Sequence, residues 1–313
     1  MKKIWSDIKF YGYKLIYGTY FKFVIYIGTY RIRKKLHILN SADTITKIVQ
    51  AHSSICRFGD GELRMVAYYL KNGNENTYNI DTFQQYDERL GKRLLEVLLS
   101  SYSNCLICLP HVFKDFSVYK GYERFHFERE YAYYRKLLEY IGIHRERMNF
   151  GDSCFTRFYY NRTDIPDLPL YIQQMKLIWN KQDIVFLEGE KSRLGVGNDL
   201  FDNAKSIQRF LLPATNAFKK YDEILTAVKQ MPKNKLYLIA LGHTATVLAY
   251  DMARLGFWAI DIGHVDIEYE WMRKGAKEKI AVPNKYVNEV PNGRIQTEFD
   301  DPVYLSQIIG KIV

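Results

Sequence analysis

No uninterrupted apolar stretch in this 313-residue sequence reaches the roughly 20 residues that a membrane-spanning helix needs. The start of the sequence also lacks a compact apolar core followed by small residues, which is the pattern of a cleavable signal peptide. Only four cysteines occur, too few for the disulfide framework of a small secreted domain. We therefore expect a cytoplasmic protein, with peripheral contact at the inner face of the membrane left open.

Motifs of several functional classes are missing as well. There is no Ser-His-Asp nucleophile elbow and no H-E-x-x-H, which disfavours a serine hydrolase and a zinc protease. The net charge is +10, but the cations are spread along the chain and no recognised nucleic-acid-binding motif is present, so no nucleic-acid partner is predicted. A basic surface also suits phosphorylated substrates or an anionic membrane face.

Two of the cysteines, Cys105 and Cys108, form a C-x-x-C inside an apolar run. If this run is a strand, positions three apart face opposite sides of the sheet, so the pair is poorly placed to share a metal ion. We expect core thiols instead.

Aromatic rings and cations are concentrated in residues 1–38. The aromatic residues are Trp5, Phe10, Tyr11, Tyr13, Tyr17, Tyr20, Phe21, Phe23, Tyr26 and Tyr30, followed by the cations Arg31, Arg33, Lys34 and Lys35. Amphipathic helices that lie in a membrane interface have this composition, whereas Lys22 disfavours a spanning helix. A helical hairpin packed on the domain, or a contact with a partner enzyme or a second copy of the chain, is the alternative. We divide the chain into an N-terminal amphipathic helical extension (1–38) and one domain (39–313).

From residue 41 onward, short apolar runs alternate with helical patterns. The expected strands are 53–58, 104–109, one within 148–158, 183–188, 207–212, 235–241 and 257–262. The expected helices include 83–99, 126–142, 216–230, 242–255 and a last short one at 302–309. This alternation predicts right-handed β-α-β units. The fold class is therefore α/β, with a mostly parallel sheet flanked by helices.

The first expected strand ends in a turn, Gly59-Asp60-Gly61-Glu62, that opens a helical pattern. Open α/β sheets bind their ligands just beyond the carboxyl end of a strand. The glycines let the backbone bend so that Asp60 and Glu62 can point the same way, and two carboxylates suit a Mg²⁺ or Mn²⁺ ion that also holds a nucleotide phosphate. An ordinary Asp-Gly turn with solvated acids is the alternative, because a lone D-x-E is a weak motif.

A glycine-rich loop at 188–199 follows the expected strand at 183–188. Its Lys191, Ser192 and Arg193 are suited to clamp a diphosphate, since arginine offers a bidentate fork. The loop matches neither the dinucleotide-binding motif nor the P-loop. A surface loop with solvated charges remains the alternative.

The turn Leu241-Gly242-His243-Thr244-Ala245-Thr246 joins the strand at 235–241 to a helix. A small-residue turn that opens a helix presents free backbone N–H groups and the positive end of the helix dipole, which favours phosphate. His243 is a further candidate contact to phosphate. In the alternative, His243 is simply exposed and a threonine of the turn caps the helix.

Four polar side chains crowd the junction between the strand at 257–262 and the next helix: Asp261, His264, Asp266 and Glu268. A carboxylate or a histidine in this position can act as the base for an acceptor hydroxyl. Capping of the helix N-terminus together with a solvated helix face is the alternative.

Three of these segments together resemble the GT-D type bacterial glycosyltransferases, a family first described as a domain of unknown function. They are Arg57-Phe58-Gly59-Asp60-Gly61-Glu62, Leu241–Asp251 and Ala259–His264, in this order, and the likeness covers roughly residues 40–290. The resemblance implies a Rossmann-like fold, a UDP-sugar donor with UDP-glucose as first candidate, and Mn²⁺ or Mg²⁺. It also implies an acceptor in a surface glycoprotein or polysaccharide. Members tend to have proline where this chain has His243.

The resemblance implies roles for individual residues. The D-x-E metal motif of the family falls on Asp60 and Glu62, and its Gly-x-Thr turn falls on Gly242 and Thr244. A glycosyltransferase must also neutralise the charge that builds on a nucleoside diphosphate leaving group.

Arg57 and Arg193 are therefore expected to face the phosphates. The candidates for the base that activates the acceptor hydroxyl are Asp261, Asp266 and Glu268. Two other functions stay open on the sequence alone: a metal-dependent phosphohydrolase or nucleotidyltransferase on a similar sheet, and a non-catalytic subunit that docks a partner enzyme at the membrane through residues 1–38.

Overall fold

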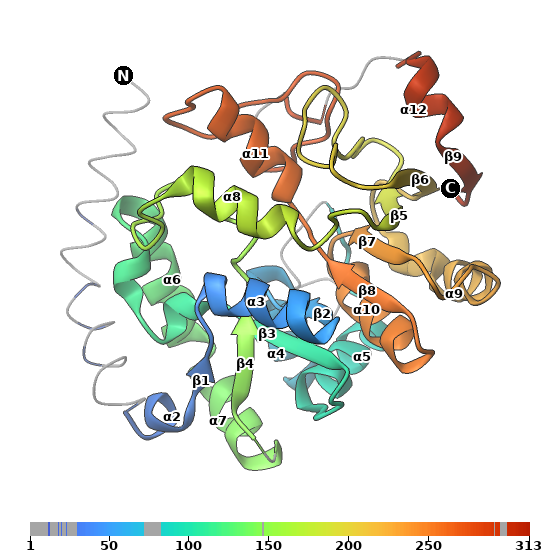
Figure 1. Cartoon of the computed structure of the whole chain (residues 1–313). Coiled ribbons are helices and arrows are strands. Elements are labelled where there is room, and N and C mark those ends of the chain that lie inside the picture. The colour runs from blue at the N-terminus through green and yellow to red at the C-terminus, as the bar shows by residue number, and fades with distance from the viewer. Residues whose placement is uncertain are drawn as a thin grey trace.

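The computed structural model describes residues 30–71, 83–145, 147–290, 292–294 and 299–313, together with the single residues 12, 18, 20 and 23 (Figure 1). Most of the aromatic and basic extension assigned to residues 1–38 lies outside this set, so its membrane or partner contact stays a prediction. In the described part of the chain, no helix combines the length and the apolar character that crossing a membrane requires.

In the described part of the chain, nine strands form one sheet in which every pair is parallel, in the order β1-β4-β3-β2-β8-β7-β5-β6-β9. The strands are β1 (His37–Ile38), β2 (Ser54–Arg57), β3 (Cys105–Leu109), β4 (Asn149–Asp152), β5 (Asp183–Gly189), β6 (Ser206–Leu212), β7 (Leu236–Ala240), β8 (Trp258–Asp261) and β9 (Ile308–Lys311). The predicted fold class, an α/β protein with a parallel sheet, is confirmed.

Helices cover both faces of this sheet (Figure 1). They are α2 (Tyr30–Lys35), α3 (Ser41–Ala51), α4 (Asp60–Leu70), α5 (Glu88–Leu99), α6 (Gly121–Tyr133), α7 (Arg135–His144), α8 (Leu168–Lys176), α9 (Tyr221–Lys229), α10 (His243–Arg254), α11 (Val265–Arg273) and α12 (Pro302–Ser306). Buried residues of α3, α8 and α11 pack on one face, and those of α4, α5, α7, α9 and α10 pack on the other.

Alternate residues of each strand feed these two cores. Cys105 belongs to the core beneath α4 and α5, whereas Cys108 belongs to the core beneath α3 and α8. Both are buried free thiols. The prediction that the C-x-x-C pair faces opposite sides of a strand is therefore confirmed.

Three predicted element boundaries were wrong. The helix predicted at 83–99 begins at Glu88, because the Asp87 side chain caps it by accepting a hydrogen bond from Leu90 N at 2.9 Å. The helix predicted at 126–142 is two helices, α6 and α7, which meet at Tyr134. The short helix predicted at 302–309 ends at Ser306, since the chain then extends as β9 along β6.

The strand order reverses direction beside β2, and this reversal positions the site. From β2 the chain proceeds outward through β3 and β4, whereas the later strands β7 and β8 fill the other side, so that β2 lies between β3 and β8. Loops that leave β2 and β8 at their carboxyl ends consequently diverge and leave a crevice, the usual ligand site of an open α/β sheet.

Candidate functional site

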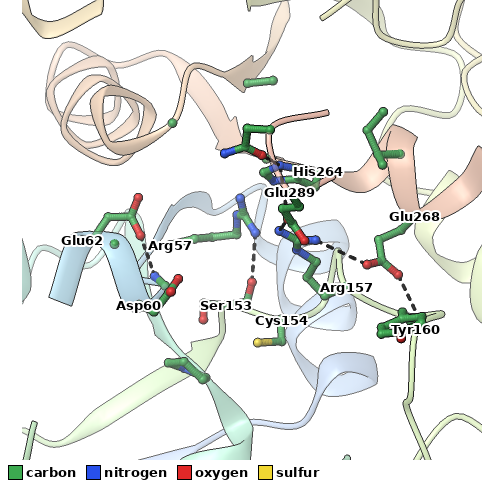
Figure 2. A pocket seen from close by; sticks show the side chains of 18 of the residues that line it. Arg57, Asp60, Glu62, Ser153, Cys154, Arg157, Tyr160, His264, Glu268 and Glu289 are labelled. Carbon is green, nitrogen blue, oxygen red and sulfur yellow. Dashed lines mark hydrogen bonds and ion pairs between the residues drawn. The ribbon is translucent and has the colours of Figure 1, made fainter. Parts of the chain in front are cut away.

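A cavity of about 570 Å³ occupies this crevice. Its walls come from the segments that follow β2, β3, β4, β5, β7 and β8 and from the segment between α11 and α12. Figure 2 shows Asp60 and Glu62 on one side of the pocket and Arg157, Glu268 and Glu289 on the other. Every loop that the sequence singled out contributes at least one residue to this cavity.

The acidic turn after β2 forms the start of α4. Gly59 is the N-cap, and Glu62 Oε2 accepts a hydrogen bond from Gly59 N at 2.8 Å, which is the N3 half of a capping box. The other oxygen, Glu62 Oε1, lies 3.8 Å from His243 Nδ1. The Asp60 side chain is 53% exposed, with Oδ2 at 3.9 Å from His126 Nε2. One carboxylate is thus held by the helix and the other is open to the cavity.

The turn after β7 lies against this acidic turn. A Cβ on Gly61 would come within 2.5 Å of His243 Nε2, so only glycine at position 61 admits the imidazole. Gly242 is the N-cap of α10 with φ +55°, and its Cα faces Phe83 so closely that a Cβ would lie 2.0 Å from that ring. The two predicted ligand-binding turns therefore meet, as parallel strands require.

Unpartnered polar atoms are concentrated at the start of α10. His243 is only 4% exposed, and neither of its ring nitrogens has a hydrogen-bond partner. The Thr244 hydroxyl is also buried without a partner, although Thr244 does not line the cavity. Buried polar groups are nearly always satisfied in folded proteins. The His243 nitrogens, which belong to a residue that lines the cavity, are therefore suited to a bound ligand, together with the N–H groups at a helix N-terminus.

Arg57, expected to face phosphates, lines the cavity but is mostly engaged within the protein. Its Nε and Nη2 donate to Asp261 Oδ1 at 3.1 and 2.9 Å, and its Nη1 donates to Ser153 O at 3.0 Å and Thr156 Oγ1 at 2.7 Å. Gly263 makes room for the guanidinium, since a Cβ there would lie 1.7 Å from Nη2. Arg57 consequently ties β2 to β8 and to the loop after β4.

The three carboxylates proposed as bases all line the cavity, and each is held by a cation. Asp261 is paired with Arg57; burial raises the pKa of Asp261 and the guanidinium opposes that rise. Asp266 accepts from Lys285 Nζ at 2.5 Å. Glu268 accepts from two backbone N–H groups and lies 3.5 Å from Arg157, and burial raises its pKa.

The alternative of a solvated helix face does not hold for Asp266 and Glu268, which are 1% and 2% exposed. Their partners favour positioning roles for these acids. That one of the three activates the acceptor hydroxyl stays a prediction.

Lys191 and Arg193, predicted to clamp a diphosphate, do not line the cavity, although Ser192 and Leu194 do. Lys191 is exposed. Arg193 has a left-handed backbone with φ +50°, and its Nη1 donates to Asn284 O at 2.9 Å while its guanidinium lies 4.7 Å from the centre of the Phe299 ring. The side chain therefore anchors the segment before α12 rather than the cavity wall, and we withdraw both cations from the phosphate site.

A charged cluster on the opposite wall was missed by the sequence reasoning. Arg157 pairs with Glu289 through Nη2 and with Glu268 through Nη1, and Lys279 Nζ lies 2.9 Å from Glu289 Oε2. Burial alone would raise the pKa of Glu289, but Arg157, His264 and Lys279 together lower it far below its ordinary value. Burial, with help from Arg157, lowers the pKa of His264 to about 4, so this imidazole is neutral at neutral pH.

No local motif marks this cluster. The members that were missed are Arg157, from the loop after β4, and Lys279 and Glu289, from residues 279–289, which the sequence presents only as an irregular tail. The charge-bearing residues Arg157 and Glu289 are 132 positions apart, so their contact is visible only once the chain is folded.

A family model described as Glycosyltransferase GT-D fold matches residues 55–290 of the chain. The chain belongs to the GT-D fold glycosyltransferase family. All the residues that line the cavity fall within the matched range. Membership favours glycosyl transfer over the phosphohydrolase, nucleotidyltransferase and docking-subunit alternatives.

Two curated relatives of this GT-D glycosyltransferase are streptococcal. One, named "Probable glycosyl transferase Gly", from Streptococcus gordonii, is 33% identical over 283 residues, which are 89% of this chain and 39% of the relative. The other, glycosyltransferase GlyD of Streptococcus pneumoniae serotype 4, is 34% identical over 278 residues, 87% of this chain and 32% of the relative. The chain thus spans about a third of the length of each.

Solved structures agree with the fold. A structure of domain of unknown function 1792, described as having a distinct glycosyltransferase fold, aligns with TM-score 0.81 and 34% identity over 92% of this chain and all of that chain (100%). A glycosyltransferase of the same domain type from Streptococcus sanguinis aligns with TM-score 0.78 and 32% identity over 89% of this chain and 100% of its own. Glycosyltransferases as a class bind a sugar donor and an acceptor, and the matched range contains the whole cavity.

Proposed function

We propose that this GT-D glycosyltransferase moves a hexose, with glucose as first candidate, from a UDP-sugar to a hydroxyl of a glycan acceptor, assisted by Mn²⁺ or Mg²⁺. The observation that carries the proposal is the contact between the two turns at the strand-order reversal. The acids of α4 and the start of α10 face one cavity there, with Glu62 Oε1 3.8 Å from His243 Nδ1. Carboxylates beside a helix N-terminus suit a cation and the diphosphate it binds.

The residues present fit a divalent cation. Asp60 and Glu62 would hold it through oxygen, and the unpartnered nitrogens of His243 supply a further donor beside them. Among the described residues, no three His, Cys, Asp or Glu side chains form a preassembled metal cage. This suits an ion such as Mg²⁺, which keeps several waters and takes the rest of its ligands from substrate phosphate. When bound, the ion would offset the negative charge that develops on the departing diphosphate.

The chain's own groups contribute to the same end. The start of α10 lines the cavity at Gly242 and His243. Its backbone N–H groups and the positive end of the helix dipole would stabilise a diphosphate there as it gains charge. Arg57 holds β2 and β8 in register by its bonds to Asp261, which keeps the acidic turn and the α10 turn at their mutual distance. Glycosyl transfer also requires that the acceptor lie on the sugar side of this diphosphate.

The aromatic and apolar residues beside Gly242 indicate which end of the cavity would bind the nucleoside of the donor. Phe83 packs on Gly242, the centre of its ring is 6.1 Å from that of Tyr286, and Leu194 lines the same cavity. The two rings lie against each other at an interplanar angle of 43°, and a flat nucleobase can stack on such an aromatic surface. The nucleoside is therefore assigned to the Phe83–Tyr286 side, and the transferred sugar to the side of Asp60.

Thermal denaturation with UDP and Mn²⁺ tests the proposal. At about 100 times its Kd, a ligand that binds only the folded state adds about 2.7 kcal/mol to the free energy of unfolding. Asp60→Asn and Glu62→Gln should each abolish most of the melting shift. Asp43→Asn is the matched control, because Asp43 lies in the first turn of α3, away from the cavity. No shift in the wild-type protein with any of a panel of nucleotide sugars would contradict the proposal.

The cellular setting is part of the proposal and rests on the family resemblance. The acceptor would be a surface glycoprotein or polysaccharide, and the reaction would take place in the cytoplasm, with residues 1–38 as the candidate contact to the membrane, to a partner enzyme or to a second copy.

A further inference from the structure

A polar and aromatic wall runs along the cavity from the acidic turn. It starts at Asp60, whose carboxylate lies 3.9 Å from His126 on α6, and continues to Tyr122, which stacks on the His126 ring at 6.3 Å with an interplanar angle of 23°. Beyond these, Asn161 Nδ2 donates to Glu123 Oε2 at 2.5 Å, which ties α6 to the loop that carries Tyr160.

The far end of this wall is closed by a cation. Lys279 Nζ lies 5.5 Å from the centre of the Tyr160 ring. The Tyr160 ring also contacts Trp271 edge to face, with the ring centres 6.4 Å apart. We call the set Tyr122, Glu123, His126, Tyr160 and Lys279 the tyrosine wall. All five residues line the cavity.

Tyr122 is the exposed member of the tyrosine wall. Its side chain is 56% exposed although it stands at the rim of the cavity. A large aromatic ring that is solvent-exposed at a concave site suits ligand binding, because it offers much contact area at a small cost in side-chain entropy. Carboxylate, imidazole and ammonium groups beside the ring add donors and acceptors for hydroxyls.

This composition matches one ligand class. A pyranose ring has a face of C–H groups, which packs on an aromatic ring, and a rim of hydroxyls, which takes hydrogen bonds. The charges in this half of the cavity favour an uncharged sugar: Arg157 pairs with Glu268 and Glu289, Lys279 pairs with Glu289, and Glu123 adds a third carboxylate to the lining. Two cations against three carboxylates leave no surplus positive charge for a uronic acid, a sulfate or a phosphate.

We propose that the tyrosine wall binds a neutral pyranose of the acceptor, with Tyr122 as its stacking surface and the polar groups beside it as partners for the hydroxyls. Its start at Asp60 brings the acceptor hydroxyl to the side of the cavity where the transferred sugar lies. The role as acceptor site rests on the proposed function, whereas the binding of a neutral pyranose at this wall can be tested by itself.

Saturation-transfer NMR tests the wall with methyl glycosides of glucose, galactose and N-acetylglucosamine, each added to the wild-type protein in the presence of UDP and Mn²⁺. At least one glycoside should bind. Tyr122→Ala should weaken that binding at least fivefold, and Tyr122→Phe should keep it because the ring remains. Methyl glucuronide should bind more weakly than methyl glucoside.

Tyr133→Ala is the matched control, since Tyr133 lies on the same helix, is 52% exposed and does not line the cavity. It should bind the glycosides as the wild type does. Binding of no glycoside, or equal binding by the wild type and Tyr122→Ala, would overturn the proposal. The melting shift with UDP and Mn²⁺, which Tyr122→Ala should leave unchanged, reports separately on the proposed function.

Discussion

The ion pair between Arg57 and Asp261 lies beneath the cavity, and its removal should lower the free energy of unfolding. The two side chains are 14% and 4% exposed, and Asp261 Oδ1 accepts from both Nε and Nη2. Removing one partner of a buried pair costs about 3–5 kcal/mol because the other charge is left buried and unpaired. Asparagine retains a carbonyl oxygen, and one retained hydrogen bond contributes about 1 kcal/mol. We therefore expect Asp261→Asn to lower the free energy of unfolding by about 3 kcal/mol.

Urea denaturation followed by circular dichroism measures this change at pH 7.5. Arg57→Met, Asp261→Asn and the double variant form a cycle that isolates the pair, since Arg57 also donates to Ser153 and Thr156. The double variant should lose clearly less than the sum of the single variants, with a coupling energy of about 2 kcal/mol. If the losses of unfolding free energy in the two single variants add up to that of the double variant, the two charges do not depend on each other for burial and the reasoning is refuted.

Three further predictions follow from single features of the structure. His264 has a pKa of about 4 in the folded protein, against an ordinary value of about 6.5, so between these values the unfolded chain binds more protons than the folded protein. The free energy of unfolding should therefore rise with pH over this range, by about 1–2 kcal/mol once the 32% exposure of the side chain is taken into account. His264→Gln should flatten that rise, as measured by urea titrations at pH 5 and pH 7. Gly61→Ala should cost about 1–3 kcal/mol and reduce the UDP melting shift, because its Cβ would lie 2.5 Å from His243 Nε2. Gly142→Ala in α7, where the nearest atom to an added Cβ is Met148 Cε at 4.0 Å, should be neutral or stabilising. Deleting residues 1–29 of the extension assigned to 1–38, which leaves α2 and β1 in place, should weaken binding to anionic vesicles in a flotation assay, and unchanged binding would remove the interfacial role.

The strands that flank the site were predictable because each is an apolar run followed at once by a turn. β2 and β7 both end in glycine-containing turns, and in a parallel sheet such turns must gather at one edge. That the acidic turn and His243 lie at the same edge of the sheet could therefore be predicted, although their direct contact could not. The edge strands were not predictable: β1 has only two residues, too few to show a period, and β9 directly follows the short helix α12, with which the start of its sequence was merged.

The side chains that complete the cavity escaped prediction for a different reason. Arg193 reads as a diphosphate clamp in sequence, but its left-handed backbone and the acceptor at Asn284 turn it to another segment. Arg157 and Glu289 carry no motif, and their pairing depends on how residues 279–289 fold back over the sheet.

That return of the chain is what makes the site a cavity rather than an open sheet edge. Lys285 is 3% exposed and its ammonium pairs with Asp266 at 2.5 Å, while Glu289 pairs with Arg157 from the loop after β4. Each contact joins the segment that follows α11 to a group at the carboxyl edge of the sheet. Because a buried charge without its partner is costly, these two pairs hold the segment closed over the pocket. Asp266, a candidate catalytic acid in the sequence, and Glu289, which no motif marks, thus explain how the wall facing Asp60 and Glu62 is kept in place.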